Sequence, residues 1–187
     1  MIPLMGDRTD PYLLPAGATR LEGAMLPFKL LAADSGGLIS VCEFTLPGWS
    51  SGPVLHAHDA VDEGFFVVSG AVEMQLGDER RTAGAGDFAW VPRGTAHTFA
   101  SASPDPLHVV GFATPGGIEH LFAEQWEYLS SVEVPDPSVL DEVGLRHGSP
   151  TLGPPIRATN ARRTSPEQAV RPVERRTPRT RILAHRG

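Results

Sequence analysis

Short apolar runs separated by turn-forming residues dominate the first two thirds of the chain. Several alternate between apolar and polar positions, as half-buried strands do. The pattern predicts eight strands, over Leu26–Leu31, Leu38–Leu46, Val54–His58, Glu63–Ser69, Ala71–Leu76, Asp87–Val91, Ala96–Ala100 and Leu107–Phe112. Residues that favour turns, mostly Gly, Pro, Ser and Asp, stand between these runs. Eight short strands at nearly regular spacing predict an all-β sandwich or barrel.

Two helices are predicted after the last strand. Within Ile118–Leu129, apolar residues recur at intervals of three and four, which is typical of an amphipathic helix. A second, shorter helix is predicted over Pro137–Val143, with Asp136 as its N-cap. One or two short C-terminal helices therefore follow the predicted strands.

Composition and charge divide the chain into three parts. The net charge is −6, but residues 150–187 carry nine Arg and only two Glu, which makes that segment +7. Prolines punctuate the segment and a periodic apolar pattern is absent, so it cannot bury enough surface to offset its ordering entropy. We expect an N-terminal extension over 1–19, one folded domain over 20–149 and a flexible, disordered basic tail over 150–187.

The basic tail has several possible partners. A basic segment can bind nucleic acid, membrane lipid or an acidic protein. Aromatic residues do not interleave with the arginines, and the tail shows no nucleic-acid-binding motif, so we expect a solvated extension. We do not expect the acidic body of the chain to bind nucleic acid.

The rest of the composition indicates a cytoplasmic protein without a membrane segment. No run approaches the roughly 18–20 apolar residues that span a bilayer. The first residues lack the pattern of a secretory signal. Cys42 is the single cysteine, so the fold cannot depend on an intramolecular disulfide.

Histidines and a glutamate in two separate segments predict a metal site. His56 and His58 are two residues apart, so on a strand both imidazoles point to one face. Glu63 begins the next strand and can face back towards them. This trio alone also arises on ordinary protein surfaces. His97, on the strand that returns after the turn Pro92–Gly94, is placed to supply a fourth ligand for a divalent ion.

Both segments resemble the conserved motifs of the cupins. The first motif is H-x-H, a short gap, Glu, six residues and Gly, and the chain matches it with His56, His58, Glu63 and Gly70. The second motif is Gly, five residues and P-x-G-x-x-H, and the chain matches it with Gly86, Pro92, Gly94 and His97. Two positions depart from the pattern, since Ser50 and Ser101 stand where cupins have Gly and Asn. Neither position is a metal ligand.

The resemblance implies a cupin jelly-roll β-barrel with the four side chains facing its interior. It also implies two or three open coordination positions, which distinguish a catalytic from a structural site. Fe(II) is the metal we expect first; Mn(II), Ni(II), Co(II) and Zn(II) also suit three imidazoles and a carboxylate. Cupin barrels commonly pair, so a homodimer is expected.

Three further segments resemble the small single-domain cupins grouped with quercetin 2,3-dioxygenases: Asp62–Asp78, Gly116–Phe122 and Leu152–Pro155. That resemblance implies a metal-dependent oxidoreductase, a dioxygenase that brings an aromatic or enolic small molecule to O2. Glu63 would be both metal ligand and catalytic base. Two alternatives use the same site: a non-redox cyclase or isomerase with the metal as Lewis acid, and a metal-containing ligand-binding module.

Strand alternation predicts which apolar side chains accompany the metal. Counting from Glu63 and His97, every second residue should point into the barrel. The candidates for the substrate pocket are Phe65, Val67, Phe88, Trp90 and Phe99. Each can equally be ordinary core packing, because barrels need interior aromatic residues whatever they bind.

The remaining histidines carry no ligand spacing, and we expect none of them to be functional: His108, His120, His147 and His185. Arg93 lies in the turn of the second motif, where an exposed charge is expected. The first predicted helix can cover one end of the barrel, and Trp126 or Tyr128 could then gate its mouth.

Overall fold

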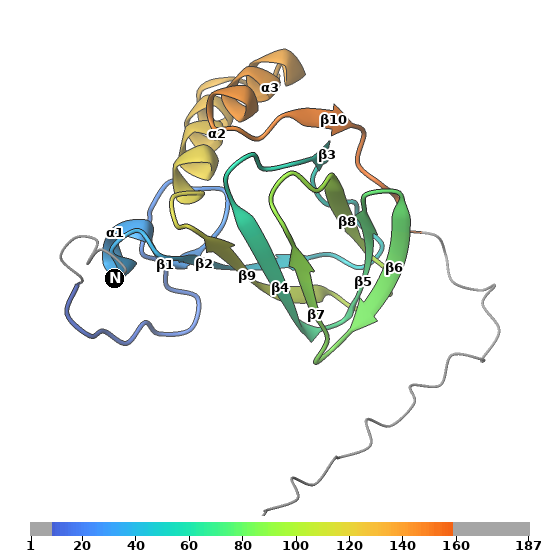
Figure 1. Ribbon diagram of the computed structural model, residues 1–187, viewed down its shortest axis with the longest axis horizontal. Helices are drawn as coiled ribbons and strands as arrows, with labels where there is room; N and C mark the ends of the chain where they lie inside the picture. The colour runs from blue at the N-terminus through green and yellow to red at the C-terminus, as the bar shows by residue number, and fades with distance from the viewer. Residues whose placement is uncertain (1–8, 159–187) are drawn as a thin grey trace, which may run out of the picture.

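Two five-stranded sheets face each other and enclose the interior of a jelly-roll barrel (Figure 1). The computed structural model describes residues 9–158. Sheet A has the order β1 (Phe28–Leu30), β2 (Ser40–Leu46), β9 (Leu107–Thr114), β4 (Asp62–Ser69), β7 (Phe88–Val91). Sheet B has the order β10 (Thr151–Gly153), β3 (Leu55–His56), β8 (His97–Ser101), β5 (Ala71–Leu76), β6 (Glu79–Gly84). All neighbouring strands are antiparallel. The prediction of an all-β jelly roll is confirmed.

All eight predicted strands are present, with shifts at their ends, and the structure adds two more. β6 was not predicted because its sequence, ERRTAG, has no apolar alternation. It forms because β5 offers a full antiparallel partner, from Leu76 opposite Glu79 to Ala71 opposite Gly84. A short helix, α1 (Ala32–Ser35), was also not predicted.

The second strand that was not predicted, β10, moves the end of the folded domain. Thr151 pairs with His56 of β3, and the side chain of Ile156 is buried. The expected boundary at residue 149 is therefore too early, since sheet B recruits residues beyond it. The rest of the expected tail, 159–187, lies outside the described residues.

The barrel core lies between the two sheets. Its buried residues come from β4, β5, β7, β8 and β9: Phe65, Val67, Val72, Met74, Val91, Phe99, Leu107 and Val109. Burial of apolar surface stabilises such a core by about 25 cal/mol per Å². The turn between β4 and β5 needs Gly70, whose φ is 80°. A Cβ atom there would lie 2.6 Å from the carbonyl oxygen of Pro106.

Two helices cover one end of the barrel (Figure 1). They are α2 (Glu119–Ser131) and α3 (Pro137–Arg146), and both were predicted. The carboxylate of Asp136 accepts a hydrogen bond from the backbone N–H of Ser138, as expected of an N-cap. Within residues 9–158, no helix is both long and apolar enough to cross a membrane.

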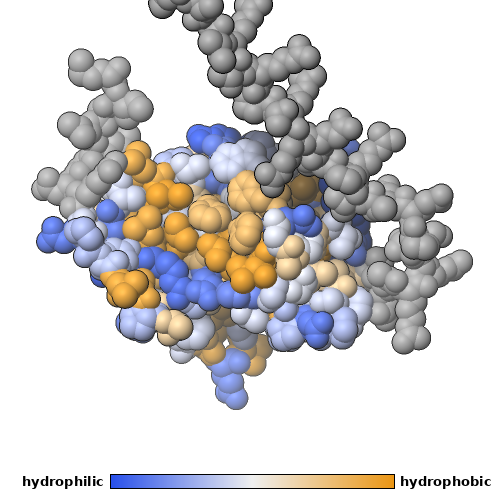
Figure 2. All heavy atoms as spheres, turned by 90° about the horizontal axis from the view of Figure 1, so that it is seen from below, coloured by the Kyte–Doolittle hydropathy of each residue, from blue (hydrophilic) through white to orange (hydrophobic). Residues whose placement is uncertain are grey.

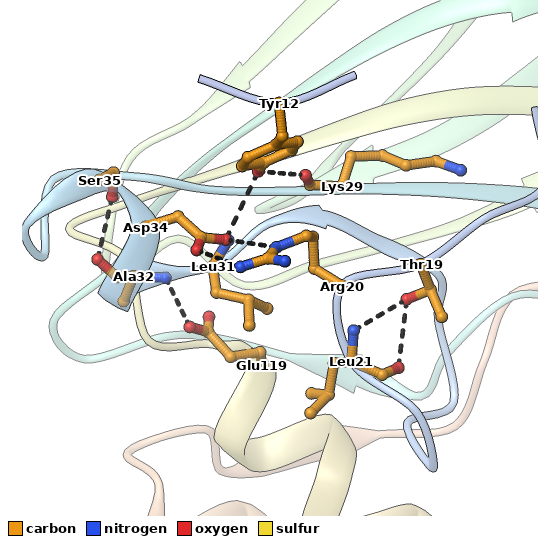
Figure 3. Close-up of polar contacts among 10 residues, drawn as sticks. All are labelled: Tyr12, Thr19, Arg20, Leu21, Lys29, Leu31, Ala32, Asp34, Ser35 and Glu119. Carbon is orange, nitrogen blue, oxygen red and sulfur yellow. Dashed lines mark hydrogen bonds and ion pairs between the residues drawn. The ribbon is translucent and has the colours of Figure 1, made fainter. Parts of the chain in front are cut away.

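A buried carboxylate joins α2 to the barrel. Glu119 is only 3% exposed. Its Oε1 accepts from the backbone N–H of Ala32 at 2.7 Å, as Figure 3 shows, and its Oε2 accepts from Ser40 Oγ at 2.5 Å and from the N–H of Gly117 at 3.1 Å. Three donors satisfy this carboxylate, so the start of α2 is fixed against α1 and β2.

A second network fastens the N-terminal segment to the same region (Figure 3). Arg20 donates two hydrogen bonds to the buried carboxylate of Asp34, at 3.1 and 2.7 Å. The hydroxyl of Tyr12 donates to the carbonyl oxygen of Lys29 at 2.7 Å. Residues 9–19 are thus held against β1 and α1 within the part of the expected extension that the structure describes.

The outer face of sheet A carries exposed apolar side chains. Phe66 and Val68 of β4 and Phe88 and Trp90 of β7 are all more than one third exposed. Figure 2 shows, on the underside of the molecule as seen in Figure 1, a broad hydrophobic area crossed by a hydrophilic band. Lys29 and His108 both contact Glu43 on that outer face.

Replacing Glu119 by Ala should destabilise the fold by about 3 kcal/mol, because it leaves the hydroxyl of buried Ser40 and the part-buried N–H of Ala32 without their acceptor. Urea unfolding measures the loss. The matched control is Glu127→Ala on the exposed side of the same helix, which should change the free energy of unfolding by less than about 0.5 kcal/mol. Equal effects of the two substitutions would contradict the role assigned to Glu119.

The Arg20–Asp34 pair should make stability depend on pH in acid. The hydrogen bonds from Arg20 hold the pKa of Asp34 below its usual 3.8, against the opposing effect of burial. A lowered pKa stabilises the fold at pH values above the unfolded pKa, and that stabilisation is lost as pH falls through the folded pKa. The advantage of the wild type over Asp34→Asn should therefore be constant above about pH 5 and shrink below pH 4. Urea unfolding at a series of pH values tests this, and Arg20→Gln should remove most of the pH dependence.

Candidate metal centre

The four predicted metal ligands converge from both sheets at one point inside the barrel. His56 of β3 and His97 of β8 are paired neighbours in sheet B, and His58 follows β3. Glu63 reaches the same point from β4 of sheet A. One ligand atom from each of the four side chains lies within 4.8 Å of every other. Distant parts of the sequence thus form a single compact cluster.

Backbone carbonyl groups orient two of the imidazoles. Nδ1 of His56 lies 2.8 Å from the carbonyl oxygen of Val54, and Nδ1 of His97 lies 2.9 Å from that of Thr95. When Nδ1 donates to a carbonyl, the proton stays on that nitrogen and Nε2 keeps its lone pair for a metal. The same i to i−2 contact therefore presets both rings as ligands.

The turn of the second motif is fixed to the first motif. Gly94 has a φ of 76°, and its N–H donates to the carbonyl oxygen of His58 at 2.8 Å. Arg93 contacts the carboxylate of Asp62 through two side-chain nitrogens, at 3.1 and 2.8 Å. Arg93 lowers the pKa of Asp62 to about 2, which keeps the carboxylate ionised. Asp62 is the first residue of β4 and directly precedes Glu63. The Arg93–Asp62 pair therefore holds the turn that leads to His97 against the start of β4.

The Arg93–Asp62 pair was not found from the sequence. Arg93 was expected to be an exposed charge in this turn, and its side chain is indeed 49% exposed, but its pairing with Asp62 was not foreseen. The available signal was the opposite charges beside the two motifs, but 31 residues separate them. Only the pairing of β4 with β7 brings them together.

Two buried polar atoms at the centre make no hydrogen bond. Oε2 of Glu63 lies 2.8 Å from Nε2 of His97 and 3.2 Å from Nε2 of His58. Both Glu63 Oε2 and His97 Nε2 are nevertheless buried without a hydrogen-bond partner. Leaving such groups unsatisfied costs about 1–3 kcal/mol each. A divalent cation would satisfy both, and three nitrogens with one carboxylate oxygen suit a borderline metal. The residues therefore fit a metal ion.

The protonation states also suit metal binding. Burial alone would raise the pKa of Glu63, but the neighbouring His58 and His97 outweigh burial and lower it to about 2. Burial lowers the pKa of His56 to about 4, with further contributions from the other two imidazoles. At neutral pH the cluster thus offers an ionised carboxylate and a neutral imidazole, the forms that bind metals.

A cavity of about 350 Å³ opens beside this cluster. Its walls come from both sheets, and α2 and α3 close one side. Aromatic side chains form much of the lining: Phe28, Phe44, Phe65, Phe99 and Phe122. Cys42 also lines the cavity, and burial, with the charge of Glu63, raises the pKa of its thiol to about 12. The thiol therefore stays protonated and does not compete as a thiolate ligand.

Two of the expected pocket residues are on the wrong side of the sheet. Phe88 is 56% and Trp90 49% exposed, on the outer face of sheet A. Phe88 pairs with Phe66 and Trp90 with Gly64, and directly paired residues share a face. Since Phe66 alternates outward from Glu63, both β7 aromatics must also point outward. The expectation that they line the cavity is wrong.

Val67 does point inward, as the alternation predicted, but it lies in the barrel core and is not among the residues that line the cavity. Phe65 and Phe99 do line it, and their rings lie 5.7 Å apart between centroids.

The proposed gate at Trp126 or Tyr128 is not supported by the position of either side chain. The side of α2 that faces the cavity consists of Ile118, Leu121, Phe122 and Gln125. Trp126 is exposed, and the hydroxyl of Tyr128 accepts a hydrogen bond from the N–H of Asp136. Neither residue is among those that line the cavity.

The other histidines lie away from the cluster. His108 contacts Glu43 at 2.8 Å on the outer face of sheet A. His147 contacts Glu124 at 2.6 Å, between α3 and α2. His120 is exposed on α2, and His185 lies outside the described residues. None of the three described histidines belongs to the cluster.

Comparison with known protein families identifies residues 43–122 as a match to the cupin domain. Among curated proteins, the chain is 29% identical over 115 residues to quercetin 2,3-dioxygenase from Bacillus subtilis (strain 168). That match covers 60% of this chain and 34% of the relative, so this chain spans about a third of the relative's length.

Two solved structures are also similar. One is a conserved protein with a double-stranded beta-helix domain from Klebsiella pneumoniae, with 20% sequence identity and a TM-score of 0.45. The match covers 57% of this chain and 80% of the Klebsiella chain. The other is KdgF from Halomonas sp., with 26% sequence identity and a TM-score of 0.41. The match covers 43% of this chain and 72% of the KdgF chain. The matched domain contains the whole His56, His58, Glu63 and His97 cluster. Both motifs, the jelly-roll topology and this domain match thus agree, and the chain contains a cupin domain over residues 43–122.

Proposed function

We propose that this protein is a metal-dependent dioxygenase that acts on an aromatic or enolic small molecule. A divalent ion, Fe(II) first and otherwise Mn(II), Ni(II), Co(II) or Zn(II), would be held by His56, His58, Glu63 and His97. The observation that carries the proposal is the pair of unsatisfied buried atoms, Glu63 Oε2 and His97 Nε2, beside an aromatic cavity. A structural site would not need such a cavity at its open side.

The metal would bind the acidic oxygen of the substrate and supply the site at which the substrate meets O2. The chain's own part begins with the cavity walls. Phe65 and Phe99 approach the cluster from the two sheets and offer flat apolar surfaces to an aromatic ring. The covering helices exclude water from this side of the cavity.

Glu63 is the candidate base. Its ionised carboxylate lies at the boundary between the cluster and the cavity, where it can accept the proton of a substrate hydroxyl. His58 and His97 stabilise the charge on this carboxylate before the proton arrives. Because Glu63 is ionised it can accept a proton, and the metal would hold the resulting substrate anion.

The curated relative lends support through its name, quercetin 2,3-dioxygenase. The non-redox cyclase or isomerase and the ligand-binding module would use the same four ligands, so they are outcomes of the experiments below. The homodimer and the cytoplasmic location remain predictions from the sequence.

Metal binding is tested by replacing one ligand. His97→Ala should reduce bound metal from about one ion per chain to less than a tenth of that, because it removes a buried ligand from the cluster. Elemental analysis of the untagged protein after reconstitution measures the content. His108→Ala removes a histidine on the outer face of sheet A and should leave the metal content unchanged. Wild-type protein that takes up no stoichiometric metal would disprove the proposal.

The reaction class is tested with quercetin and simpler enols under air and under argon. Metal-loaded protein should consume O2 only when substrate is present, and Glu63→Gln should lower turnover at least about 100-fold, because it removes both the base and the charged metal ligand. Oxygen-electrode traces and product analysis measure both effects. Conversion without O2 uptake would indicate Lewis-acid chemistry, and binding without conversion would indicate a ligand-binding module.

A further inference from the structure

Few polar side chains line the cavity outside the metal cluster, and two of them already make hydrogen bonds within the protein. Ser40 donates its hydroxyl hydrogen to Glu119, at 2.5 Å. Thr151 donates to Asp141, at 2.6 Å. Apart from the metal cluster, three polar side chains of the wall make no hydrogen bond within residues 9–158: Ser51, Gln125 and Ser149. A ligand can therefore make polar contacts with the wall at few positions.

Gln125 stands out among these because it breaks the pattern of its helix. Positions 118, 121, 122 and 125 form the side of α2 that faces the cavity, and the first three are apolar. A fourth apolar residue would pack there without cost, whereas a carboxamide brings two donors and an acceptor into the wall. A half-buried polar group without a protein partner gains when a ligand or water satisfies it.

The charge of the wall limits the ligand further. The part of the cavity wall that the structure describes contains neither lysine nor arginine. Its only carboxylate is Glu63, which belongs to the metal cluster. A phosphate, sulfate or second carboxylate on the ligand would thus enter an apolar wall without a countercharge, which is strongly unfavourable.

We propose that Gln125 is a specificity-determining residue that donates a hydrogen bond to, or accepts one from, a neutral hydroxyl or carbonyl group on the ligand. This inference rests on the proposed function, since the ligand's acidic oxygen is taken to bind at the cluster. The ligand class is then an aromatic or enolic molecule with one metal-binding acidic group and at least one further neutral polar substituent. The barrel would hold the metal and supply the aromatic surfaces, and Gln125 of α2 would recognise the additional substituent.

The test measures equilibrium binding without turnover. Full-length protein loaded with Ni²⁺ is titrated under argon with 3-hydroxyflavone, which has a metal-binding group and no other hydroxyl. It is then titrated with a series of 3-hydroxyflavones that carry one additional hydroxyl at each ring position in turn. Absorbance of the bound flavonol gives Kd for the wild type, for Gln125→Leu and for the control Glu127→Leu on the exposed side of α2.

At one or more ring positions, the additional hydroxyl should tighten binding about fivefold in the wild type and in Glu127→Leu, and not in Gln125→Leu. Binding of 3-hydroxyflavone itself and the nickel content should be the same in all three proteins. If no position shows this dependence on Gln125 while the flavonols still bind through the metal, the inference is overturned and the proposed function stands. If no flavonol binds to the nickel-loaded wild type, both are overturned.

Discussion

The contact between Glu63 and His97 is the constraint around which the barrel is organised. Oε2 of one and Nε2 of the other lie 2.8 Å apart, on strands of opposite sheets, and both atoms are buried without a hydrogen bond. Such a pair is rare in a protein interior, and a bound ion would satisfy both atoms. The supports follow from this need: carbonyl oxygens orient the imidazoles, and the Arg93–Asp62 pair fixes the turn that carries His97.

Two of the buried glutamates among the described residues, Glu63 and Glu119, differ in how their carboxylate oxygens are satisfied. Glu119 is 3% exposed and accepts hydrogen bonds from three donors. Glu63 is 8% exposed, and its Oε2 has no hydrogen-bond partner. A satisfied carboxylate holds elements together, whereas an unsatisfied one is available for a metal or a proton. The helix that Glu119 anchors is the one that closes the cavity and presents Gln125.

The alternation of side chains along the strands decides which residues line the cavity and which lie on the outer face of the sheet. Alternation places Phe65 beside Glu63 in sheet A and Phe99 beside His97 in sheet B, so aromatic rings and metal ligands share one interior. The same alternation sends Phe66 outward, where it meets Phe88 and Trp90 on the exposed face. The apolar character of the strands thus supports both a binding cavity and an exposed surface.

The sequence by itself determined eight of the ten strands, the two C-terminal helices and the four residues of the cluster. It could do so because strand alternation, helical period and the motif spacings are local patterns. Only the tertiary structure decided the rest. The face of β7 that points into the barrel depends on its register with β4. The strands β6 and β10 form because β5 and β3 pair with them, although the sequences of β6 and β10 do not show a strand pattern. Likewise, Arg93 and Gln125 gained their positions from contacts across the fold, because charge pairing and cavity walls are properties of residues that only folding brings together.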